Sequence, residues 1–424
     1  MFQVMSASWA LFLGMFMLMI GNGLQGTLLG LRGDMEGFST FALSIVMSGY
    51  FVGFLFSSRL TPMLIQRVGH VRVFAALGST ISAVLILYPV LVDPWSWTVG
   101  RVIIGFCFCG VYVTAESWLN DASSNETRGK ALSLYLMVQM AGIVVAQYIV
   151  TQGDVSGYAL FIVPSVLVSL AFAPILLSIR PMPQFAQTKP MTIRRLIDAS
   201  PLGCVGMFLL GGIFSAQFGM SAIYGARVGL SVSQISVFVS VIYVSALIAQ
   251  YPIGWLSDRI DRRLLILAVG IIGGAGALLA FFIQDSFSVI LISAAILGGT
   301  SNPLYALLIA YTNDYLERED MAAASGGLLF INGVGAIAGP ITVGYMMDTL
   351  GANGFWIFSA VLMLMMGVYA AYRMTRRSRS DIDVDDAVSY AAISATSTPI
   401  VAEVAQEVYV DAEEEAFLED AAAP

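Results

Sequence analysis

Two charged side chains, Arg101 and Glu116, stand inside a long apolar stretch of the sequence. At about 100° per residue of an α-helix, they share one face with Gly105 and Tyr112. An arginine in an apolar setting can hold a carboxylate bidentately, and a buried glutamate can take up and release a proton. Fifteen residues at ~1.5 Å each put the two charges ~22 Å apart, too far for a direct ion pair. The spacing therefore predicts two separate sites: a substrate-anion or proton-coupling site at Arg101, and a proton-coupling carboxylate at Glu116.

Each of these residues also has a simpler interpretation. Arg101 follows Trp97 closely, and a long arginine side chain can reach out of the hydrocarbon to the interface beside a tryptophan. Glu116 lies near the end of its apolar stretch and could pair at a gate with a loop arginine such as Arg72 or Arg128. We favour a functional role for Arg101, because an intramembrane charge usually faces a cavity or a partner. For Glu116 the two interpretations stay open.

Other polar residues occur near the middle of further apolar stretches. Amides and tyrosines at helical spacing could bind a small anion or a polar neutral solute. They could instead join one helix to another, which contributes only ~0.6 kcal/mol on average. The candidates for substrate binding are Arg101, Asn22, Gln25, Tyr112, Gln217, Tyr224, Asn302 and Tyr305. A heptad stripe of Ser236, Tyr243 and Gln250 is expected to be a packing seam.

The composition excludes whole classes of protein. Of 424 residues, 58% are hydrophobic and only 11% are charged, whereas a soluble domain carries about 25% charged residues. A soluble enzyme and a nucleic-acid-binding protein are both excluded. The net charge of −8 is local, because residues 381–424 hold 12 of the 28 acidic residues and no Lys or Arg. This acidic tail, rich in Ala, Asp, Glu and Ser, is expected to be disordered in the cytoplasm.

The apolar stretches are long enough to cross a membrane. Roughly 20 apolar residues span the hydrocarbon core as a helix, and the sequence predicts twelve such helices in an all-α integral membrane protein. The stretch that follows MFQVMSASWA is too long for a signal peptide and lacks a basic start, so it is expected to be a retained first span. The twelve windows are residues 8–31, 40–60, 71–92, 96–119, 130–150, 156–179, 202–225, 233–256, 264–284, 287–310, 323–347 and 352–373.

The basic residues indicate how the spans are oriented. Alternate joints between spans hold 17 of the 20 Lys and Arg residues, and such joints face the cytoplasm. Both termini are therefore expected on the cytoplasmic side of the inner membrane. The longest joint, residues 181–201, separates a six-helix bundle at residues 1–180 from a second at 202–375, and the tail follows from residue 376.

The two halves are similar in sequence. Gly105 and Tyr112 recur 193 residues later as Gly298 and Tyr305, and QRVGHV at 66–71 matches DRIDRR at 258–263 with an offset of 192. Asn22 matches Gln217 at an offset of 195. Six spans return the chain to its starting side, so the repeats run parallel and are related by a pseudo-twofold axis.

Specific segments carry a resemblance to a known family. GWLSDRIDRR at 254–263 resembles the signature loop G-x-L-x-D-R-x-x-R-R of the major facilitator superfamily, and Arg101 with Gly105 resembles its R-x-x-x-G element. The counterpart loop at 62–72 departs from the pattern, with Pro62 for Gly and Gln66 for Asp. AESWLN at 115–120, RGKAL at 128–132 and PLYALLIAYTND at 303–314 are similar to the little-characterised bacterial branch of YcaD-type transporters.

The resemblance implies a secondary active transporter in which two bundles rock about a midplane site lined by spans 1, 4, 7 and 10. It also implies a cytoplasmic gating loop, where Asp258 holds an arginine or a helix N-terminus in one state and releases it in another. Plain basic anchoring is the alternative. The expected gating residues are Gly254, Asp258, Arg259, Arg262, Arg263, Arg67, Arg72 and Arg128.

No metal, cofactor or enzymatic site is predicted. Cys107, Cys109 and Cys204 fall in apolar windows without paired spacing, and His70, the single histidine, is expected in a solvated loop. The expected partners are a small-molecule substrate, the lipid bilayer and, through Glu116, protons, with the protein a monomer. The alternative function is a transporter-like membrane sensor or scaffold that signals through its acidic tail.

Overall fold

The structure, a computed structural model, describes residues 2–121, 123, 125–177 and 191–376, and within these ranges every regular element is an α-helix. The all-helical class is therefore confirmed. The helices are α1 (Phe2–Met35), α2 (Thr40–Val68), α3 (His70–Leu87), α4 (Pro94–Asp121), α5 (Asn125–Val150), α6 (Ala159–Leu177), α7 (Ile193–Ala199), α8 (Pro201–Arg227), α9 (Val232–Ser257), α10 (Arg262–Phe282), α11 (Phe287–Asn313), α12 (Arg318–Leu350) and α13 (Gly354–Arg376).

Each of the twelve predicted windows coincides with one of these helices. Among the described residues, eleven helices are long and apolar enough to cross a membrane. The remaining one, α6, offers a shorter apolar segment, Ala159–Pro174, which contains Pro164. The membrane-spanning architecture is confirmed, whereas twelve complete crossings stay a prediction.

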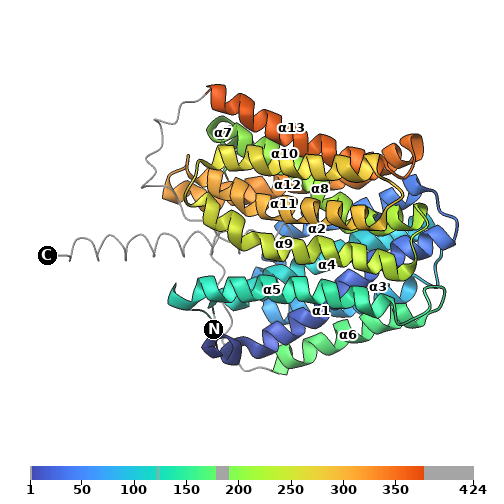
Figure 1. Cartoon of the computed structure of the whole chain (residues 1–424). Coiled ribbons are helices and arrows are strands. Elements are labelled where there is room, and N and C mark those ends of the chain that lie inside the picture. The colour runs from blue at the N-terminus through green and yellow to red at the C-terminus, as the bar shows by residue number, and fades with distance from the viewer. Residues whose placement is uncertain (1, 122, 124, 178–190, 377–424) are drawn as a thin grey trace.

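The helices lie side by side with their axes roughly aligned (Figure 1). We call α1–α6 the first half and α8–α13 the second half. The start of α1, the short α7 and the end of α13 lie at one end of the molecule, the terminal end, and the opposite end is the far end (Figure 1). Within the halves, α2 packs extensively on α4, α1 on α5 and α6, α8 on α12, α10 on α13 and α9 on α11. The halves meet along α2 and α12, α1 and α8, and α5 and α9.

The same turn closes the far end after α1 and after α8. Gly37 has φ 75° and Gly229 has φ 77°, in the left-handed region that favours glycine. Two residues after each glycine, Ser39 and Ser231 cap α2 and α9, and each side chain accepts a hydrogen bond from the backbone N–H three residues on. The repeat seen in the sequence is thus confirmed in backbone conformation.

Matched glycines also set the closest helix contacts in both halves. A Cβ added to Gly105 of α4 would lie 1.9 Å from the Tyr50 carbonyl oxygen of α2. A Cβ added to Gly298 of α11 would lie 2.3 Å from the Ile242 carbonyl oxygen of α9. The α2–α4 and α9–α11 pairs therefore pack in the same way, and Tyr50 occupies the position of Ile242.

The joint between the halves contains a helix that the sequence did not indicate. Thr192 caps α7, Leu196 is fully buried, and Arg195 reaches Asp320 of α12 at 2.5 Å. The described end of the joint is therefore docked on the second half. Residues 178–190 and the acidic tail from 377 lie outside the described residues, so the domain boundaries and the disorder of 381–424 stay predictions.

The prediction that His70 lies in a solvated loop is wrong. His70 is the first residue of α3 and is only 3% exposed, because the chain turns directly from α2 into α3 at Gly69. Its ring lies 6.4 Å from the ring of Trp118 on α4. A basic stretch between two spans can therefore place a side chain in the interior as well as in water.

Candidate functional site

The polar face predicted for α4 lies inside the first half. Arg101 and Tyr112 are fully buried and Glu116 is 2% exposed. Side chains from α1, α2 and α5 cover this face, and Gly105 sits against α2. Because α4 packs along α2, the face expected to line a central cavity is enclosed by neighbouring helices in this structure.

Arg101 lies in the part of α4 nearer the far end. Its guanidinium carbon is 4.8 Å from the centre of the Tyr50 ring, which it overlies. Full burial rules out the alternative in which Arg101 reaches an outer interface beside Trp97, which is itself buried and donates its indole N–H to the Tyr88 carbonyl at 3.0 Å. None of the guanidinium nitrogens of Arg101 has a hydrogen-bond partner in the part of the chain that the structure describes.

Glu116 lies toward the terminal end of the same helix. The Tyr135 hydroxyl of α5 donates a hydrogen bond to its carboxylate at 3.2 Å. Arg72 is exposed, and the side chain of Arg128 lies outside the described residues. The choice between a coupling carboxylate and a gate partner therefore stays open.

A first amide cluster joins α1, α2 and α4. Asn22 donates through Nδ2 to the Tyr112 hydroxyl at 2.9 Å and to the Tyr50 hydroxyl at 3.3 Å. Gln25 donates through Nε2 to Asn22 Oδ1 at 3.0 Å. Three of the predicted substrate-binding residues thus lie in one buried group, to which the structure adds Tyr50.

A second amide cluster joins α8 and α11. Gln217 donates through Nε2 to the Ser301 hydroxyl at 2.8 Å. Asn302 donates through Nδ2 to Gln217 Oε1 at 3.5 Å and to the Gly298 carbonyl at 3.3 Å. Gln217 and Asn302 were predicted, whereas Ser301 was missed because a serine within an apolar span is common and carries little signal.

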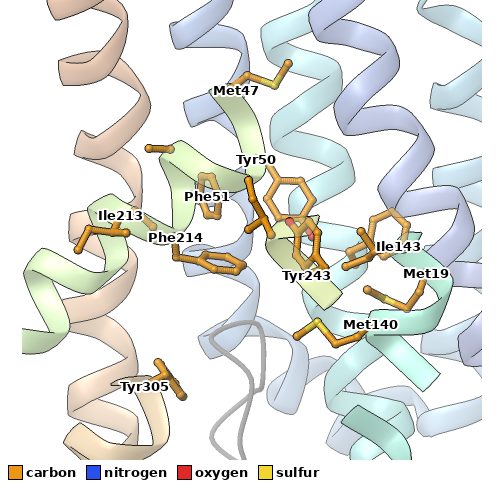
Figure 2. Packing of buried hydrophobic residues seen from close by; sticks show 14 of the residues in the cluster. Met19, Met47, Tyr50, Phe51, Met140, Ile143, Ile213, Phe214, Tyr243 and Tyr305 are labelled. Carbon is orange, nitrogen blue, oxygen red and sulfur yellow. The ribbon is translucent and has the colours of Figure 1, made fainter. Parts of the chain in front are cut away.

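Aromatic side chains fill the seam between the two clusters. The ring of Tyr50 on α2 lies 5.4 Å from that of Phe218 on α8, and the rings of Phe51 and Phe214 are 6.4 Å apart. Figure 2 shows Tyr50 beside Tyr243 of α9, the residue predicted to belong to a packing seam. Tyr50 was not predicted, since its importance comes from neighbours on other helices.

Two predicted tyrosines lie apart from these groups. Tyr224 stacks on Phe355 at 5.2 Å and packs edge-on to Trp356, so it belongs to an aromatic core between α8, α9 and α13 rather than to the surroundings of Gln217. Tyr305 is 2% exposed and lies at a distance from Tyr50 and Tyr243 in Figure 2.

At the terminal end, the predicted gating loop forms a clamp within the second half. Arg262, the first residue of α10 and 5% exposed, binds the carboxylate of Asp314 at the end of α11. It also donates to the Ser257 hydroxyl at 3.1 Å and lies 3.7 Å from Asp258. The predicted contact of Asp258 with an arginine is present, but Asp314 is the closer acid. At the repeat offset of 193, Asp314 also matches Asp121, and this recurrence of an acidic residue could have indicated it.

The other expected gating residues have simpler surroundings. Arg259 lies over the Trp255 ring at 4.2 Å, and Arg263 pairs with Asp261 at 2.7 Å. Gly254 is buried in the last turns of α9, whereas Arg67 is exposed. The clamp around Arg262 joins α10 to the end of α11.

An ion pair crosses between the halves at the far end. Arg227, at the end of α8, lies 3.2 Å from Asp34 of α1 and donates to the Phe38 carbonyl at 2.9 Å. At the offset of 195 that relates Asn22 to Gln217, the counterpart of Arg227 is Arg32. Arg32 instead stays within the first half, where it pairs with Glu36 at 2.7 Å. Only one of these two related arginines therefore links the halves.

Comparison with known sequences assigns this architecture to a family. The Major Facilitator Superfamily model matches residues 11–226 and 202–401. Curated relatives named uncharacterized MFS-type transporter YcaD are 26% identical in Salmonella typhi and 27% identical in Escherichia coli O139:H28. Both alignments run over 351 residues, 82% of this chain and 90% of the relative.

Solved structures support the same fold. The nucleoside transporter NupG, as a D323A mutant, superposes with a TM-score of 0.73 at 14% identity and covers 86% of this chain and 99% of its own. A bacterial homologue of the human lysosomal transporter Spinster gives a TM-score of 0.67 at 14% identity, over 96% of this chain and 98% of its own. At such identities the likeness concerns the fold alone.

Proposed function

Because the chain belongs to the major facilitator superfamily, we propose that it is a secondary active transporter that moves a small molecule across the cytoplasmic membrane by alternating access. Family membership makes it a multi-pass membrane transport protein. The direction of the termini, the twofold rocking of the halves and the coupling to protons belong to the proposal.

The observation that carries the proposal is the matched pair of amide clusters. Asn22 and Gln217 are repeat counterparts, one on α1 and one on α8. Each bonds to the fourth helix of its own half, Asn22 to Tyr112 and Gln217 to Ser301. Side-chain amides that face one another across a seam of aromatic rings can exchange their internal hydrogen bonds for bonds to a polar solute. Both clusters can therefore serve one substrate held between the halves.

The seam suits a reversible contact. Its aromatic rings, such as those of Tyr50 and Phe218, are held together by the apolar area that they bury. They can therefore separate without breaking an ion pair at mid-depth. Rigid-body closure of two packed units around a ligand is a familiar way to alternate access. The amide clusters would then bind the solute while the aromatic rings separate on one side and close on the other.

The test begins with ligand discovery. A thermal-shift screen of the purified protein against metabolites and drugs supplies candidates, which are then followed as counterflow into proteoliposomes. N22A and Q217A should each raise the half-saturation concentration about tenfold, as expected for a lost hydrogen bond to a bound solute.

A matched control separates binding from packing. Asn332 of α12 is also a buried amide, but it donates to the Met207 carbonyl of α8 at 3.0 Å within the second half. N332A should lower stability and leave the half-saturation concentration unchanged. The site assignment fails if N22A, Q217A and N332A all behave alike.

Proton coupling rests on Glu116, the carboxylate that α4 carries inside the first half. E116Q keeps the shape of the side chain and removes its exchangeable charge. It should abolish accumulation driven by a pH gradient while counterflow continues. Accumulation that still follows the pH gradient in E116Q would remove this residue from the mechanism.

No feature of the described residues favours the sensor alternative, whose output segment, residues 381–424, lies outside them. Deleting those residues should leave counterflow intact.

A further inference from the structure

Arg101 carries a charge in the interior without the partners that buried charges usually have. It is 0% exposed, and its Nε, Nη1 and Nη2 atoms have no hydrogen-bond partner among the described residues. A buried charge is strongly unfavourable unless it is paired and hydrogen-bonded. The site is therefore incomplete as it stands.

The donor edge of the guanidinium makes no hydrogen bond to the described residues. The Tyr50 ring lies under one face, 4.8 Å from the guanidinium carbon. Stacking of this kind occupies the face of the planar group and leaves its N–H groups pointing outward in the plane. A carboxylate accepts two such N–H bonds side by side.

A second unpartnered donor lies near Arg101. Tyr88, at the end of α3, is 2% exposed, and its hydroxyl also has no partner among the described residues. The titratable groups close enough to influence Arg101 are the two phenols Tyr50 and Tyr88, and no described carboxylate is among them. A Cβ added to Gly100, the neighbour of Arg101, would lie 3.1 Å from the Tyr88 hydroxyl oxygen. The indole N–H of Trp97 holds the Tyr88 backbone in place by donating to its carbonyl at 3.0 Å. The arginine and the hydroxyl together form a group of donors with a single positive charge.

The fold itself does not require an arginine here. At the repeat offset of 193, the counterpart of Arg101 is Ala294, which is also fully buried. The counterpart of Tyr50 by the glycine contact is Ile242. The second half therefore builds the same helix pair from apolar side chains, and Arg101 with Tyr50 is an addition to that scaffold.

We propose that Arg101 and Tyr88 form a binding subsite for a monoanion, and that its occupant is the carboxylate of the transported substrate. This inference rests on the proposed transport function. One positive charge neutralises one negative charge, so a dianion would leave an uncompensated charge in the interior. Tyr50 connects the subsite to the first amide cluster, because its hydroxyl accepts from Asn22. A substrate held by its carboxylate at Arg101 therefore lies beside residues that can bind its polar groups.

Carboxylates and halides share the required charge, so the test includes both. Purified full-length protein in nanodiscs is melted with acetate, lactate or benzoate and, as neutral isosteres, with acetamide, lactamide or benzamide. To detect binding of a halide, the melting temperature in sodium chloride is compared with that in sodium sulfate at equal ionic strength. The carboxylates should raise the melting temperature, and their amides should not.

Variants assign the effect to the subsite. R101Q should lose the response to carboxylates, R101K should weaken it because the fork is lost, and Y88F should weaken apparent binding about tenfold. R195Q, which removes an exposed arginine paired with Asp320, is the matched control and should respond as the wild type does. If R101Q does not fold, R101K and Y88F still carry the comparison.

Three outcomes would overturn the inference. The first is a rise in melting temperature with carboxylates that R101K and Y88F leave unchanged. The second is a wild-type protein that responds to the carboxylates no more than to their amides. The third is a response to chloride alone, which would make the site one for an inorganic ion. None of these results touches the proposed function, since a carrier of neutral solutes would fail here and still show counterflow.

Discussion

At equivalent positions of the repeat, the first half carries Arg101 and Glu116 where the second half carries Ala294 and Ile309, all four of them buried. At the terminal end, the buried arginine belongs to the second half instead. There the second half begins α10 with Arg262, which is bound to Asp314, and the first half begins α3 with His70, packed against Trp118.

This difference separates structural from functional charges. The two halves share their far-end turn and their glycine contacts, so one scaffold accepts either set of side chains. A paired charge at a helix end can hold α10 to α11, as the clamp around Arg262 does. In α4, by contrast, Arg101 makes no hydrogen bond to the described residues, and Glu116 accepts one from the Tyr135 hydroxyl of α5. We assign these two charges to ligand and proton.

The largest effect is expected where the clamp is broken on one side. R262A leaves the 6% exposed carboxylate of Asp314 without its main cation, and removal of one partner of a buried pair costs about 3 to 5 kcal/mol of stability. H70A, at the equivalent position of the first half, removes the ring that packs against Trp118. It leaves the Arg262–Asp314 pair intact, so it should destabilise the protein less. Melting of both variants in nanodiscs makes the comparison.

A double variant checks the cause of that loss. R262M/D314L replaces the pair by apolar groups and should recover most of the stability that R262A loses. Equal losses in R262A and H70A would remove the distinction between the two halves.

The shared scaffold predicts equal costs at its matched glycines. G105A and G298A each push a Cβ into a backbone carbonyl, and overpacking of this kind costs about 1 to 3 kcal/mol. G326A is the control, because nothing lies within 4 Å of its added Cβ, and it should gain up to about 1 kcal/mol of helix propensity. A large cost in only one half would show that the two helix pairs are packed differently in solution.

A smaller effect is expected at the arginines of the far end. Arg227 pairs across the halves with Asp34, and both side chains are about a third exposed, so R227A should cost about 0.2 to 1 kcal/mol. High salt should reduce this loss, because salt screens exposed charges.

Cysteines placed at positions 34 and 227 should crosslink less in the presence of substrate if the seam opens there.

The smallest effect concerns pH and the capping of α4. Backbone and side-chain donors of Ser96 and the N–H of Trp95 lower the pKa of Asp93 below its usual value. A depressed folded pKa means that the stabilisation is present above the unfolded pKa of about 3.9 and is lost as pH falls through the folded value. D93N should therefore lower the melting temperature slightly at pH 7, and this loss should be smaller at pH 3. The counterpart Ser286 makes no side-chain cap bond in α11, so S286A should change nothing at either pH.

Much of this arrangement follows from the sequence because it depends on local periodicity. The windows, the repeat offsets and the shared face of Arg101, Tyr112 and Glu116 all come from spacing along one helix. Tyr50 and Tyr88 could not be predicted, because they are defined by what other helices bring to them. His70 was misjudged for the same reason, since the ring of Trp118 comes from a different span.

The start of α1 and the end of α13 both lie at the terminal end, so the distance between them offers a way to follow movement of the two halves. One helix begins the first half and the other ends the second, so fluorophores attached to these two points label both halves at the terminal end. If the halves tilt against each other during transport, as proposed, the energy transfer between these fluorophores would rise or fall. Such a pair of labels would follow the cycle in real time without any knowledge of the cargo.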